Sequence, residues 1–330
     1  MKTLLSVLGG LVLALLIAAG YVHSQLSKPA TLSGSFAAAQ GEAAFGIVTR
    51  LHGEGLIDTP PALLKLAAFL TADAGQFKAG EYDIAAGLSS YELLALLRSG
   101  RVRQYSLTFP EGWRFAQWRR RLDSHPALVH TSADMTEAAL AKELAIEGEL
   151  EGWFFPDTYH FAKGESDLAL LRRAHLLMRA QLDELWAAGS ARDSFDRPYE
   201  ALILASIIEK ETALPKDRGL VASVFHNRLD GNRMRLQSDP TVIYGLGEAF
   251  DGNLTRRHLK TDGAYNTYTR DGLPPSPICM PGRGSILAAL NPTPSDYLYF
   301  VATGKGQTRF SATLREHNRA VTKYQRSKQP

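Results

Sequence analysis

The segment Tyr199–Thr212 most constrains the fold and chemistry open to this chain. It has the pattern of an apolar helix that ends in two carboxylates separated by one residue. A carboxyl group at the end of an apolar helix can have its pKa raised toward neutrality, since burial disfavours the charged form. Cleavage of an acetal, such as a glycosidic bond, requires an acid that is still protonated at working pH. The pattern therefore indicates general-acid chemistry.

The two glutamates of this helix end differ in their neighbours. Residues three and four apart share a helix face, so Glu211 lies over Ile207 and Ile208, whereas Glu209 lies over smaller residues. Glu211 is the better candidate for a raised pKa, and Glu209 is its rival. The alternative is that both are solvated residues at a fraying helix end.

Composition excludes several function classes. At 330 residues the chain can hold two or three domains, and its net charge of +3 is too small and too evenly spread for a nucleic-acid partner. A single cysteine, Cys279, excludes an internal disulfide and a cysteine-based zinc site. The nine histidines form no zinc-hydrolase motif. We therefore expect neither a metal nor another cofactor.

The N-terminus carries a location signal. Residues from Leu4 to Val22 are almost wholly apolar, and this run of about 19 residues matches a bilayer core. A cleaved signal peptide is the alternative, since small residues stand near the end of the run. The length of the run favours an uncleaved anchor, and Lys2 favours a cytoplasmic N-terminus. With either an anchor or a cleaved signal peptide, the chain after about residue 23 is expected to be exported.

The sequence predicts an α+β protein with five consecutive regions. Residues 1–22 form a cytoplasmic tip and a transmembrane helix, and 23–40 a polar linker. Residues 41–105 form a small α+β module. Residues 106–195 connect this module to a catalytic core at 196–330.

Periodicity predicts individual elements. In the small module these are a strand at 45–48, a helix at 61–70, a strand at 80–84 and a helix at 91–97. Ser89 or Ser90 is expected to cap the second helix, and Gly100 to end it. Farther along, strands are expected at 107–109 and 296–302, and helices at 114–122, 168–186, 216–229 and from 313. The aromatic segment 150–159 has no regular period and either packs in the core or walls a cleft, and His317 is expected on the surface.

Polar side chains gather on loops after the glutamate helix: Gln237, Asp239, Tyr244, Asn266 and Tyr268. They offer hydrogen bonds to hydroxyl and N-acetyl groups and aromatic faces for pyranose rings, as a sugar site requires. Ordinary glycoside hydrolysis needs a second carboxylate. Asp239 is one candidate for it, although Pro240 beside it is equally typical of a turn cap.

Seven motifs stand in one order along the chain: Leu150–Tyr159, Ala205–Thr212, Val221–Leu229, Leu236–Gly245, Ala264–Tyr268, Gly272–Pro275 and Tyr297–Ala302. Together they resemble the endolytic murein transglycosylases (the MltG or YceG-like family), and the resemblance covers nearly the whole chain. It implies a single-pass protein of the bacterial inner membrane whose C-terminal part lies in the periplasm. The small module at 41–105 resembles the family's LysM-like module, by pattern only.

The resemblance also implies an activity. The family cuts nascent peptidoglycan glycan strands internally, between N-acetylmuramic acid and N-acetylglucosamine, and leaves 1,6-anhydro ends, which limits strand length. Partners would be the glycan strands, the inner membrane and peptidoglycan synthases or proteins of the divisome or elongasome. A catalytically idle peptidoglycan-binding scaffold and a hydrolase that releases reducing ends are the alternatives.

A lyase of this kind needs one carboxyl group, which protonates the leaving oxygen and then takes the proton of the attacking C6 hydroxyl. Lytic transglycosylases carry this acid in a Glu-Ser context at the end of a lysozyme-like helix, and Glu211-Thr212 resembles that context. By the same resemblance Gln237 and Asn266 would bind sugar hydroxyls or developing charge. Tyr244 and Tyr268 would line the cleft, and Asp239 would orient its neighbours.

Overall fold

The computed structural model describes residues 2–30, 33–39, 41–70, 77–191, 194–231, 234–304 and 306–325. It is a mixed helix and strand protein, as the sequence predicts, and the chain forms two compact units. The first unit combines Met1–Ser106 with His160–Glu165, and the second combines Leu107–Tyr159 with Ser166–Pro330.

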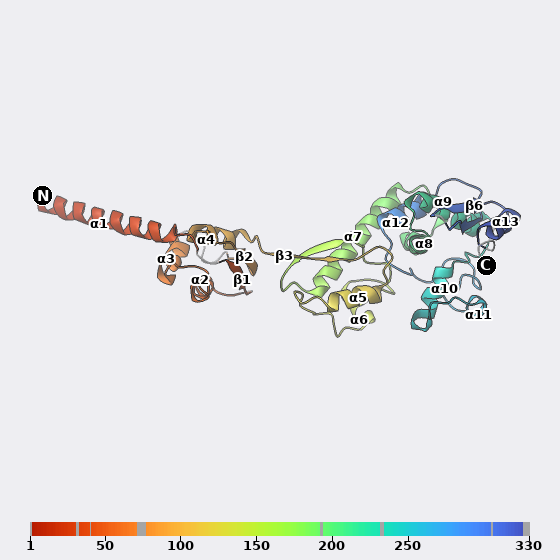
Figure 1. Ribbon diagram of the computed structural model, residues 1–330, viewed down its shortest axis with the longest axis horizontal. Helices are drawn as coiled ribbons and strands as arrows, with labels where there is room; N and C mark the ends of the chain where they lie inside the picture. Colours follow the sequence, from red (N-terminus) through yellow and green to blue (C-terminus); the bar gives the residue numbers. More distant parts are fainter. Residues whose placement is uncertain are drawn as a thin grey trace. The chain divides into compact units, whose positions relative to one another are not determined.

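The first helix, α1 (Lys2–Leu26), is apolar and exposed along most of its length (Figure 1). Its stretch Leu5–Leu26 has 22 residues, which suffices for a bilayer core at about 1.5 Å per residue. Within the described ranges it is the one helix long and apolar enough to cross a membrane. This is compatible with the predicted single-pass anchor, and a signal sequence has the same character.

The rest of the first unit is built around a strand pair. Its elements are β1 (Gly34–Ala38), α2 (Ala44–Gly53), α3 (Pro61–Leu70), β2 (Gly80–Ile84) and α4 (Ser90–Ser99). Strands β1 and β2 pair antiparallel with Phe36 opposite Tyr82, and both side chains are buried. The three helices bury Ile47, Leu64 and Leu93 against them.

Most local predictions for this unit are confirmed. The helix at 61–70 and the strand at 80–84 have the expected bounds. Helix α4 starts with a capping box, in which the Ser89 hydroxyl accepts from the Glu92 backbone N–H and the Glu92 carboxylate accepts from that of Ser89. The helix ends at Gly100, whose φ of 68° is left-handed.

Two predictions differ from the structure. The strand predicted at 45–48 is wrong, because this segment lies in α2, whose buried residues Ile47 and Leu51 are spaced for one helix face. Residues 34–38, which the sequence analysis assigned to the linker, form β1. Phe36 and Ala38 alternate with exposed residues there, and the small neighbouring side chains made this alternation hard to recognise.

The second unit is mainly helical. Its elements are α5 (Phe115–Asp123), α6 (Glu137–Glu143), α7 (Asp167–Ala188), α8 (Pro198–Glu211), α9 (Pro215–His226), the π-helical turn η2 (Asn227–Gly231), α10 (Asp239–Leu246), the 3-10 turn η3 (Gly247–Ala249), α11 (Arg256–Lys260), α12 (Arg283–Leu290), β5 (Tyr299–Ala302), β6 (Thr308–Ser311) and α13 (Leu314–Tyr324). β5 and β6 pair antiparallel, with Phe300 opposite Phe310. β3 (Gln104–Thr108) pairs with β4 (Thr158–Ala162), and the division between the units runs through both strands.

The predicted elements of this unit are confirmed to within a few residues. The helices expected at 114–122 and 168–186 are α5 and α7, and the one expected from 313 is α13. The helix expected at 216–229 is α9, which ends at His226 and continues as η2. Of the strand expected at 296–302, only the part from Tyr299 is a strand.

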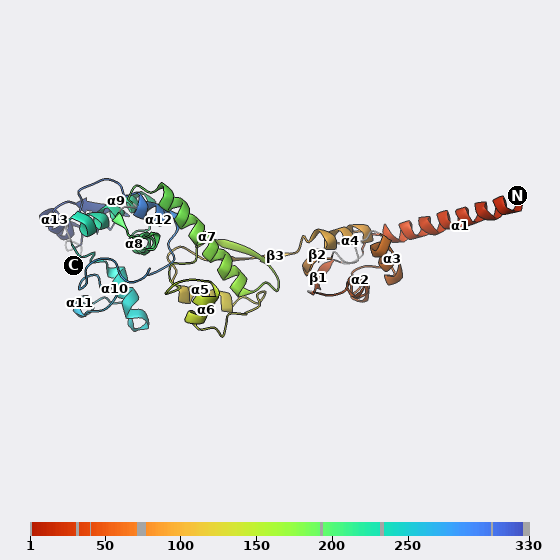
Figure 2. The ribbon, with the colours of Figure 1, turned by 180° about the vertical axis from the view of Figure 1, so that it is seen from behind.

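Helix α8 is the centre of this unit. It begins with Pro198 at its first turn, where a missing N–H costs nothing, and every residue from Ala201 to Ile208 is buried. A helix that is apolar all round must be covered all round. Helices α7, α9, α10 and α12 pack against it and provide this cover (Figures 1 and 2).

The aromatic segment 150–159 contributes largely to the core. Phe154 is fully buried and stacks with Phe115 at 5.3 Å between ring centroids. Phe109 stacks on Trp118 at 3.7 Å in the same cluster. The sequence left two alternatives for this segment, packing in the core or forming the wall of a cleft. These rings pack in the core.

Gly152 tests the packing of this segment. Its φ of 86° is left-handed, and a Cβ at this position would collide with the Pro277 ring. We expect Gly152→Ala to lower the free energy of unfolding by at least about 3 kcal/mol, because backbone strain and overpacking add. Thermal unfolding followed by circular dichroism measures the loss.

Gly148→Ala is the matched control, because Gly148 has nearly the same φ of 88° but open space around its Cβ position. Backbone strain alone predicts a loss of about 1 kcal/mol there. Equal losses at the two positions would contradict the packing described for residue 152.

Candidate active site

The last turn of α8 separates its two carboxylates. Residues two apart on a helix point about 200° apart, so Glu209 and Glu211 face nearly opposite sides. Ile207 and Ile208 beneath them are fully buried. The structure gives the two glutamates entirely different surroundings.

Glu209 is held by the start of α12. One of its oxygens accepts from the Ser285 hydroxyl at 2.7 Å and from the Gly282 backbone N–H at 3.0 Å. The other lies 3.3 Å from the Arg218 guanidinium. Gly282 is the N-cap of α12, so the carboxylate accepts from one backbone N–H at a helix start, where the helix dipole favours negative charge. With 7% of its side chain exposed, Glu209 ties α8 to α12.

Glu211 faces a groove with a volume of about 390 Å³. The Ser238 hydroxyl donates to its Oε1 at 2.6 Å. Burial raises the pKa of Glu211 to about 7, although the hydrogen bond from Ser238 opposes this rise. The nearby charges of Asp239 and Arg228 have smaller effects of opposite sign. Near neutral pH this carboxyl group therefore exists in both its acid and its base form.

Segments far apart in sequence form the groove. Its lining residues are Glu211, Arg228, Leu236, Gln237, Asp239, Tyr268, Tyr299, Phe300, Leu314, His317 and Asn318. They come from the end of α8, from η2, from the segment that leads into α10, from the loop before Gly272, and from β5 and α13. The groove lies entirely within the second unit.

Arg228 joins two walls of the groove. Its guanidinium donates to the Leu298 carbonyl through Nε and to the Leu236 carbonyl through Nη1. It also lies over the Tyr299 ring, 5.5 Å from the centroid. Burial lowers the pKa of Arg228, and the nearby Tyr299 and Glu211 oppose this. A buried cation thus stands beside the Glu211 carboxyl group.

The segment that carries Ser238 is rigid. Gln237 has a φ of 51°, a conformation that non-glycine residues seldom adopt, and its N–H donates to the Thr267 carbonyl at 3.1 Å. The Ser238 N–H donates to the Thr267 hydroxyl at 3.0 Å, and the Thr241 hydroxyl to the Ser238 carbonyl at 2.8 Å. These bonds fix the Ser238 hydroxyl in place, and the Gln237 side chain lines the groove.

Asp239 and Tyr268 lie together in the groove. The Tyr268 hydroxyl donates to the Asp239 carboxylate at 2.6 Å. Burial, the hydrogen bond to Asp239 and its charge raise the pKa of Tyr268 well above its usual range, so the phenol stays neutral. With Glu211 and Gln237, four of the residues singled out from the sequence line one groove.

Asn266 and Tyr244 lie elsewhere. The amide N–H groups of Asn266 donate to carbonyl groups at the end of α11, and its side-chain oxygen accepts from the Tyr268 N–H at 2.9 Å. Asn266 therefore holds the backbone that carries Tyr268. Tyr244 contacts the ring of Tyr265 and, with its hydroxyl 3.3 Å away, the Glu151 carboxyl group.

Sequence reasoning missed much of the groove. Ser238 and Arg228 lie inside motifs that resemble the family, but nothing about their residue types singled them out. Tyr299 and His317 come from the C-terminal elements, and their rings stack at 5.1 Å. The expectation that His317 is a surface residue is wrong, because it is partly buried and lines the groove, and burial lowers its pKa.

A second cavity of about 620 Å³ lies between α5 and the end of α10. Glu151 lines it, is 7% exposed and accepts from the Phe115 N–H at 3.0 Å. Burial raises the pKa of Glu151 to about 8. Arg114 lines the same cavity and lies over the Tyr244 ring, 4.9 Å from the centroid.

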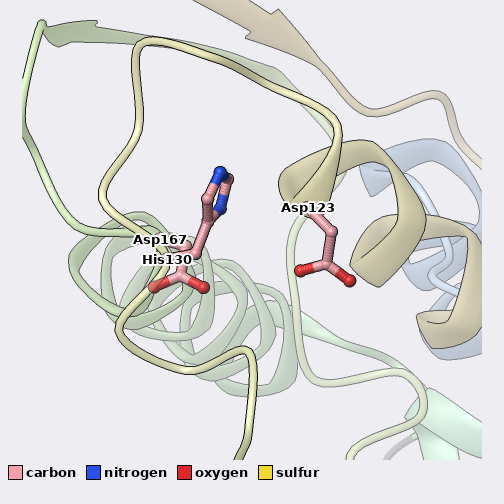
Figure 3. A group of neighbouring side chains, drawn as sticks. All are labelled: Asp123, His130 and Asp167. Atoms are coloured by element: carbon pink, nitrogen blue, oxygen red, sulfur yellow. The ribbon is translucent and has the colours of Figure 1, made fainter.

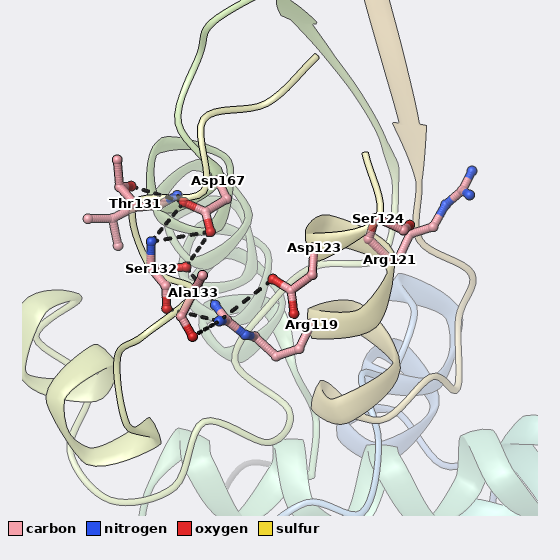
Figure 4. Close-up of polar contacts among 9 residues, drawn as sticks. Arg119, Arg121, Asp123, Ser124, Thr131, Ser132, Ala133 and Asp167 are labelled. Carbon is pink, nitrogen blue, oxygen red and sulfur yellow. Dashed lines mark hydrogen bonds and ion pairs between the residues drawn. The ribbon is translucent and has the colours of Figure 1, made fainter. Parts of the chain in front are cut away.

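One group among the described residues brings together atoms able to bind a metal: Asp123, His130 and Asp167, whose potential ligand atoms lie within 4.8 Å of one another (Figure 3). Both oxygens of Asp167 accept hydrogen bonds from Ser132, and the Arg119 guanidinium lies 3.8 Å from Asp123 (Figure 4). The Arg119 guanidinium therefore already supplies positive charge next to this group of side chains. The arrangement fastens the start of α7 to the loop between α5 and α6.

Comparison with known proteins places these observations in a family context. A family model described as the YceG-like family matches residues 36–323. A crystal structure of a YceG-like protein from Listeria monocytogenes is 31% identical, with a TM-score of 0.57, and covers 87% of this chain and 98% of that one.

Curated relatives are also similar. A protein of Bacillus subtilis (strain 168) named endolytic murein transglycosylase is 32% identical over 273 residues, covering 77% of this chain and 75% of the relative. One of the same name from Streptococcus pneumoniae (strain D39) is 27% identical over 292 residues. That match covers 76% of this chain and 51% of the relative, so this chain spans about half of the pneumococcal protein.

The raised pKa of Glu211 predicts a pH-dependent change in stability. An unfolded chain loses this proton near pH 4.5 and the folded chain near pH 7, so the wild type loses stability as pH rises through that window. The loss is at most about 3 kcal/mol. We expect Glu211→Gln to unfold at a higher temperature than the wild type at pH 8 but at the same temperature at pH 4.5.

Glu209→Gln is the matched control at the same helix end. It breaks the ion pair with Arg218 and weakens the cap of α12, so we expect a loss of about 1–3 kcal/mol at pH 8. Thermal unfolding of both variants at the two pH values measures the difference. If Glu211→Gln were destabilised at pH 8 as much as Glu209→Gln, the charged form of Glu211 would not be the one that burial disfavours, and the assignment would be contradicted.

Proposed function

Because the chain belongs to the YceG-like family, we propose that it is a lytic transglycosylase that cuts peptidoglycan glycan strands internally and leaves 1,6-anhydro-muramoyl ends. One observation carries the proposal. Glu211 lines an open groove with its pKa raised to about 7, whereas Glu209 is enclosed by protein partners. Glu211 is thus the carboxyl group that a polysaccharide can reach.

In the first step protonated Glu211 donates its proton to the oxygen of the bond between N-acetylmuramic acid and N-acetylglucosamine. The bond from this oxygen to C1 of the muramoyl residue breaks, and the N-acetylglucosamine hydroxyl leaves. Ser238 donates to Oε1 of Glu211, so Oε2 can carry the transferable proton. As Glu211 becomes charged, this hydrogen bond strengthens and stabilises the carboxylate.

In the second step the Glu211 carboxylate takes the proton of the C6 hydroxyl of the same muramoyl residue. The C6 oxygen then bonds to C1 and closes the 1,6-anhydro ring. No water is consumed, and Glu211 is protonated again, now with the proton of the C6 hydroxyl, whereas its first proton has left on the N-acetylglucosamine hydroxyl. One carboxyl group therefore suffices, which agrees with a groove in which Asp239 is engaged by Tyr268.

The other groove residues orient the substrate. The amide of Gln237 and the hydroxyl of Tyr268 are suited to sugar hydroxyl and N-acetyl groups, and the exposed parts of Tyr299 and Phe300 to a pyranose face. Asp239 positions the Tyr268 hydroxyl, and Asn266 positions the Tyr268 backbone. Tyr244 lies at the second cavity and has no role in this step.

We further propose that α1 is a single-pass anchor in the bacterial inner membrane and that residues after it lie in the periplasm. The apolar stretch Leu5–Leu26 and the N-terminal position of α1 support this. The module at 41–105 would then be a LysM-like contact to peptidoglycan close to the membrane. Nascent strands, and the peptidoglycan synthases or divisome and elongasome proteins around them, are the partners that fit this location.

The products of the reaction test the activity. Purified glycan strands incubated with the protein should give anhydro-muropeptides by mass spectrometry. We expect Glu211→Gln to reduce their rate of formation by about 10²–10⁴-fold, because the general acid and base is lost. Glu209→Gln, compared per folded molecule, should retain most of the activity.

The same assay in ¹⁸O-labelled water separates the alternatives. Label at C1 of the muramoyl residue would identify a hydrolase that releases reducing ends. Binding of strands without any cleavage product would identify an idle scaffold. Either result would overturn the proposed reaction.

Ser238 predicts a shift in the pH profile. Its hydrogen bond to Glu211 favours the charged carboxylate and so lowers the pKa of that group. Removing the hydroxyl in Ser238→Ala should raise the pKa of Glu211 and move the alkaline limb of kcat/KM to higher pH. Activity against pH, measured for both proteins with the same strands, gives the shift.

Ser223→Ala is a suitable control, because its hydroxyl is also buried but pairs with Ser295. It should leave the limb where it is in the wild type. An alkaline limb that stays in place in Ser238→Ala would mean that Glu211 does not govern it.

A further inference from the structure

Helix α3 exposes an apolar face. Leu64, Ala67 and Ala68 are buried in the first unit. On the opposite side Phe69 is 69% exposed and Leu66 41% exposed. Outside α1, Phe69 is the most exposed large apolar side chain of the described residues. An apolar stripe on a monomer's surface indicates a contact that the monomer alone does not provide.

This face follows helical spacing. Ala62, Leu66 and Phe69 are four and three residues apart, so they lie on one side of the helix. All three are exposed, and none is polar. The one charged residue of α3 is Lys65, which lies at the border of the face and is only partly buried. A long basic side chain in that position can extend toward lipid headgroups.

The end of α1 is fixed to the same unit. The Thr59 hydroxyl, just before α3, donates to the Gln25 carbonyl at 3.0 Å and also pairs with Ser90 at 2.7 Å. Leu26 is buried in the core of the unit, and α3 packs against α1. Figures 1 and 2 show α3 at the end of α1 in both views. The distance of α3 from the apolar span is therefore set by the fold.

The residues around this junction are typical of a membrane interface. Tyr21 is exposed near the end of the apolar span, and the ring of Tyr91 from α4 lies 5.8 Å from His23. Lys28 follows the span and is exposed. Aromatic rings and basic side chains are enriched at this depth of a bilayer. Because α3 packs against α1 beside this junction, an exposed apolar face of α3 has lipid as a nearby partner.

We propose that the face of α3 formed by Ala62, Leu66 and Phe69 lies in the interfacial layer of the membrane that α1 crosses. The inference rests on the proposed anchor, and it adds a second lipid contact beside it. An amphipathic element buries its apolar side chains at the boundary of headgroups and acyl chains in this way. The contact would prevent the first unit from tilting or rotating freely about α1.

Site-specific fluorescence in vesicles tests the proposal. The full chain is reconstituted in vesicles of phosphatidylethanolamine and phosphatidylglycerol, with an environment-sensitive fluorophore on one introduced cysteine. Cys279 is fully buried and does not compete for the label. The variants are Phe69→Cys, Leu13→Cys within the span, and Ser99→Cys at the far end of α4, about 13 Å along that helix from its start beside α1.

Two nitroxide lipids are the quenchers, one with its spin label near the headgroup and one with its label deep in the acyl chain. We expect strong quenching at position 13 by the deep label, strong quenching at position 69 by the headgroup label, and none at position 99 by either, with blue-shifted emission at position 69. Quenching at 13 together with unquenched, water-like emission at 69 would overturn the second contact and leave the anchor intact. Blue-shifted but unquenched emission at 69 would identify protein, such as a second copy, as the cover and would also overturn it.

The failure of the anchor has its own signature. If the label at position 13 is unquenched, α1 is not in the bilayer. The proposed anchor and the inference about α3 then both fail. This outcome differs from one in which position 69 alone is unquenched.

Discussion

The complete burial of α8 is the constraint from which the candidate site follows. Its residues from Ala201 to Ile208 are covered on all sides, and its five leucine and isoleucine side chains together contribute about 10 kcal/mol of hydrophobic free energy before conformational entropy is subtracted. Helix α8 therefore cannot rotate or slide without exposing apolar surface. Its last turn is held against the core, and with it the two glutamates. The packing that folds the unit also creates the dry surroundings that raise the pKa of Glu211.

The different roles of Glu209 and Glu211 follow from what compensates each charge. Glu209 has a guanidinium, a hydroxyl and a helix N-terminus around it, so its charge is matched by fixed protein groups. Among the described residues Glu211 has one hydroxyl donor, Ser238, and the nearby charges of Asp239 and Arg228 act in opposite directions. A charge that is fully matched is useful for structure. A charge that is poorly matched can be given up, and this property suits a carboxyl group to acid and base chemistry.

Sequence reasoning succeeded where the signal is local and failed where it depends on distant neighbours. The caps of α4 and the apolar periodicity of α3 and α7 depend only on residues close together in the sequence, and the bounds of these helices were predicted closely. The preference for Glu211 came from two isoleucines one turn away. By contrast, β1 has small side chains and is recognised only through its pairing with β2. Arg228, Tyr299 and His317 reach the groove from η2, β5 and α13, and no spacing in the sequence reports that proximity.

A group that first gives a proton and later takes one works best when its two forms are close in free energy, and a pKa of about 7 means that they are equal at pH 7. A bound glycan strand would remove water from the groove and so favour the neutral acid, the form needed for the first step. Once the proton has left, the Ser238 hydroxyl and the buried cation of Arg228 face a full negative charge instead of a neutral group. Both interactions then strengthen, and they hold the carboxylate until the C6 hydroxyl returns a proton. The modest strength of these two interactions in the resting protein is therefore consistent with a single carboxyl group that serves both steps.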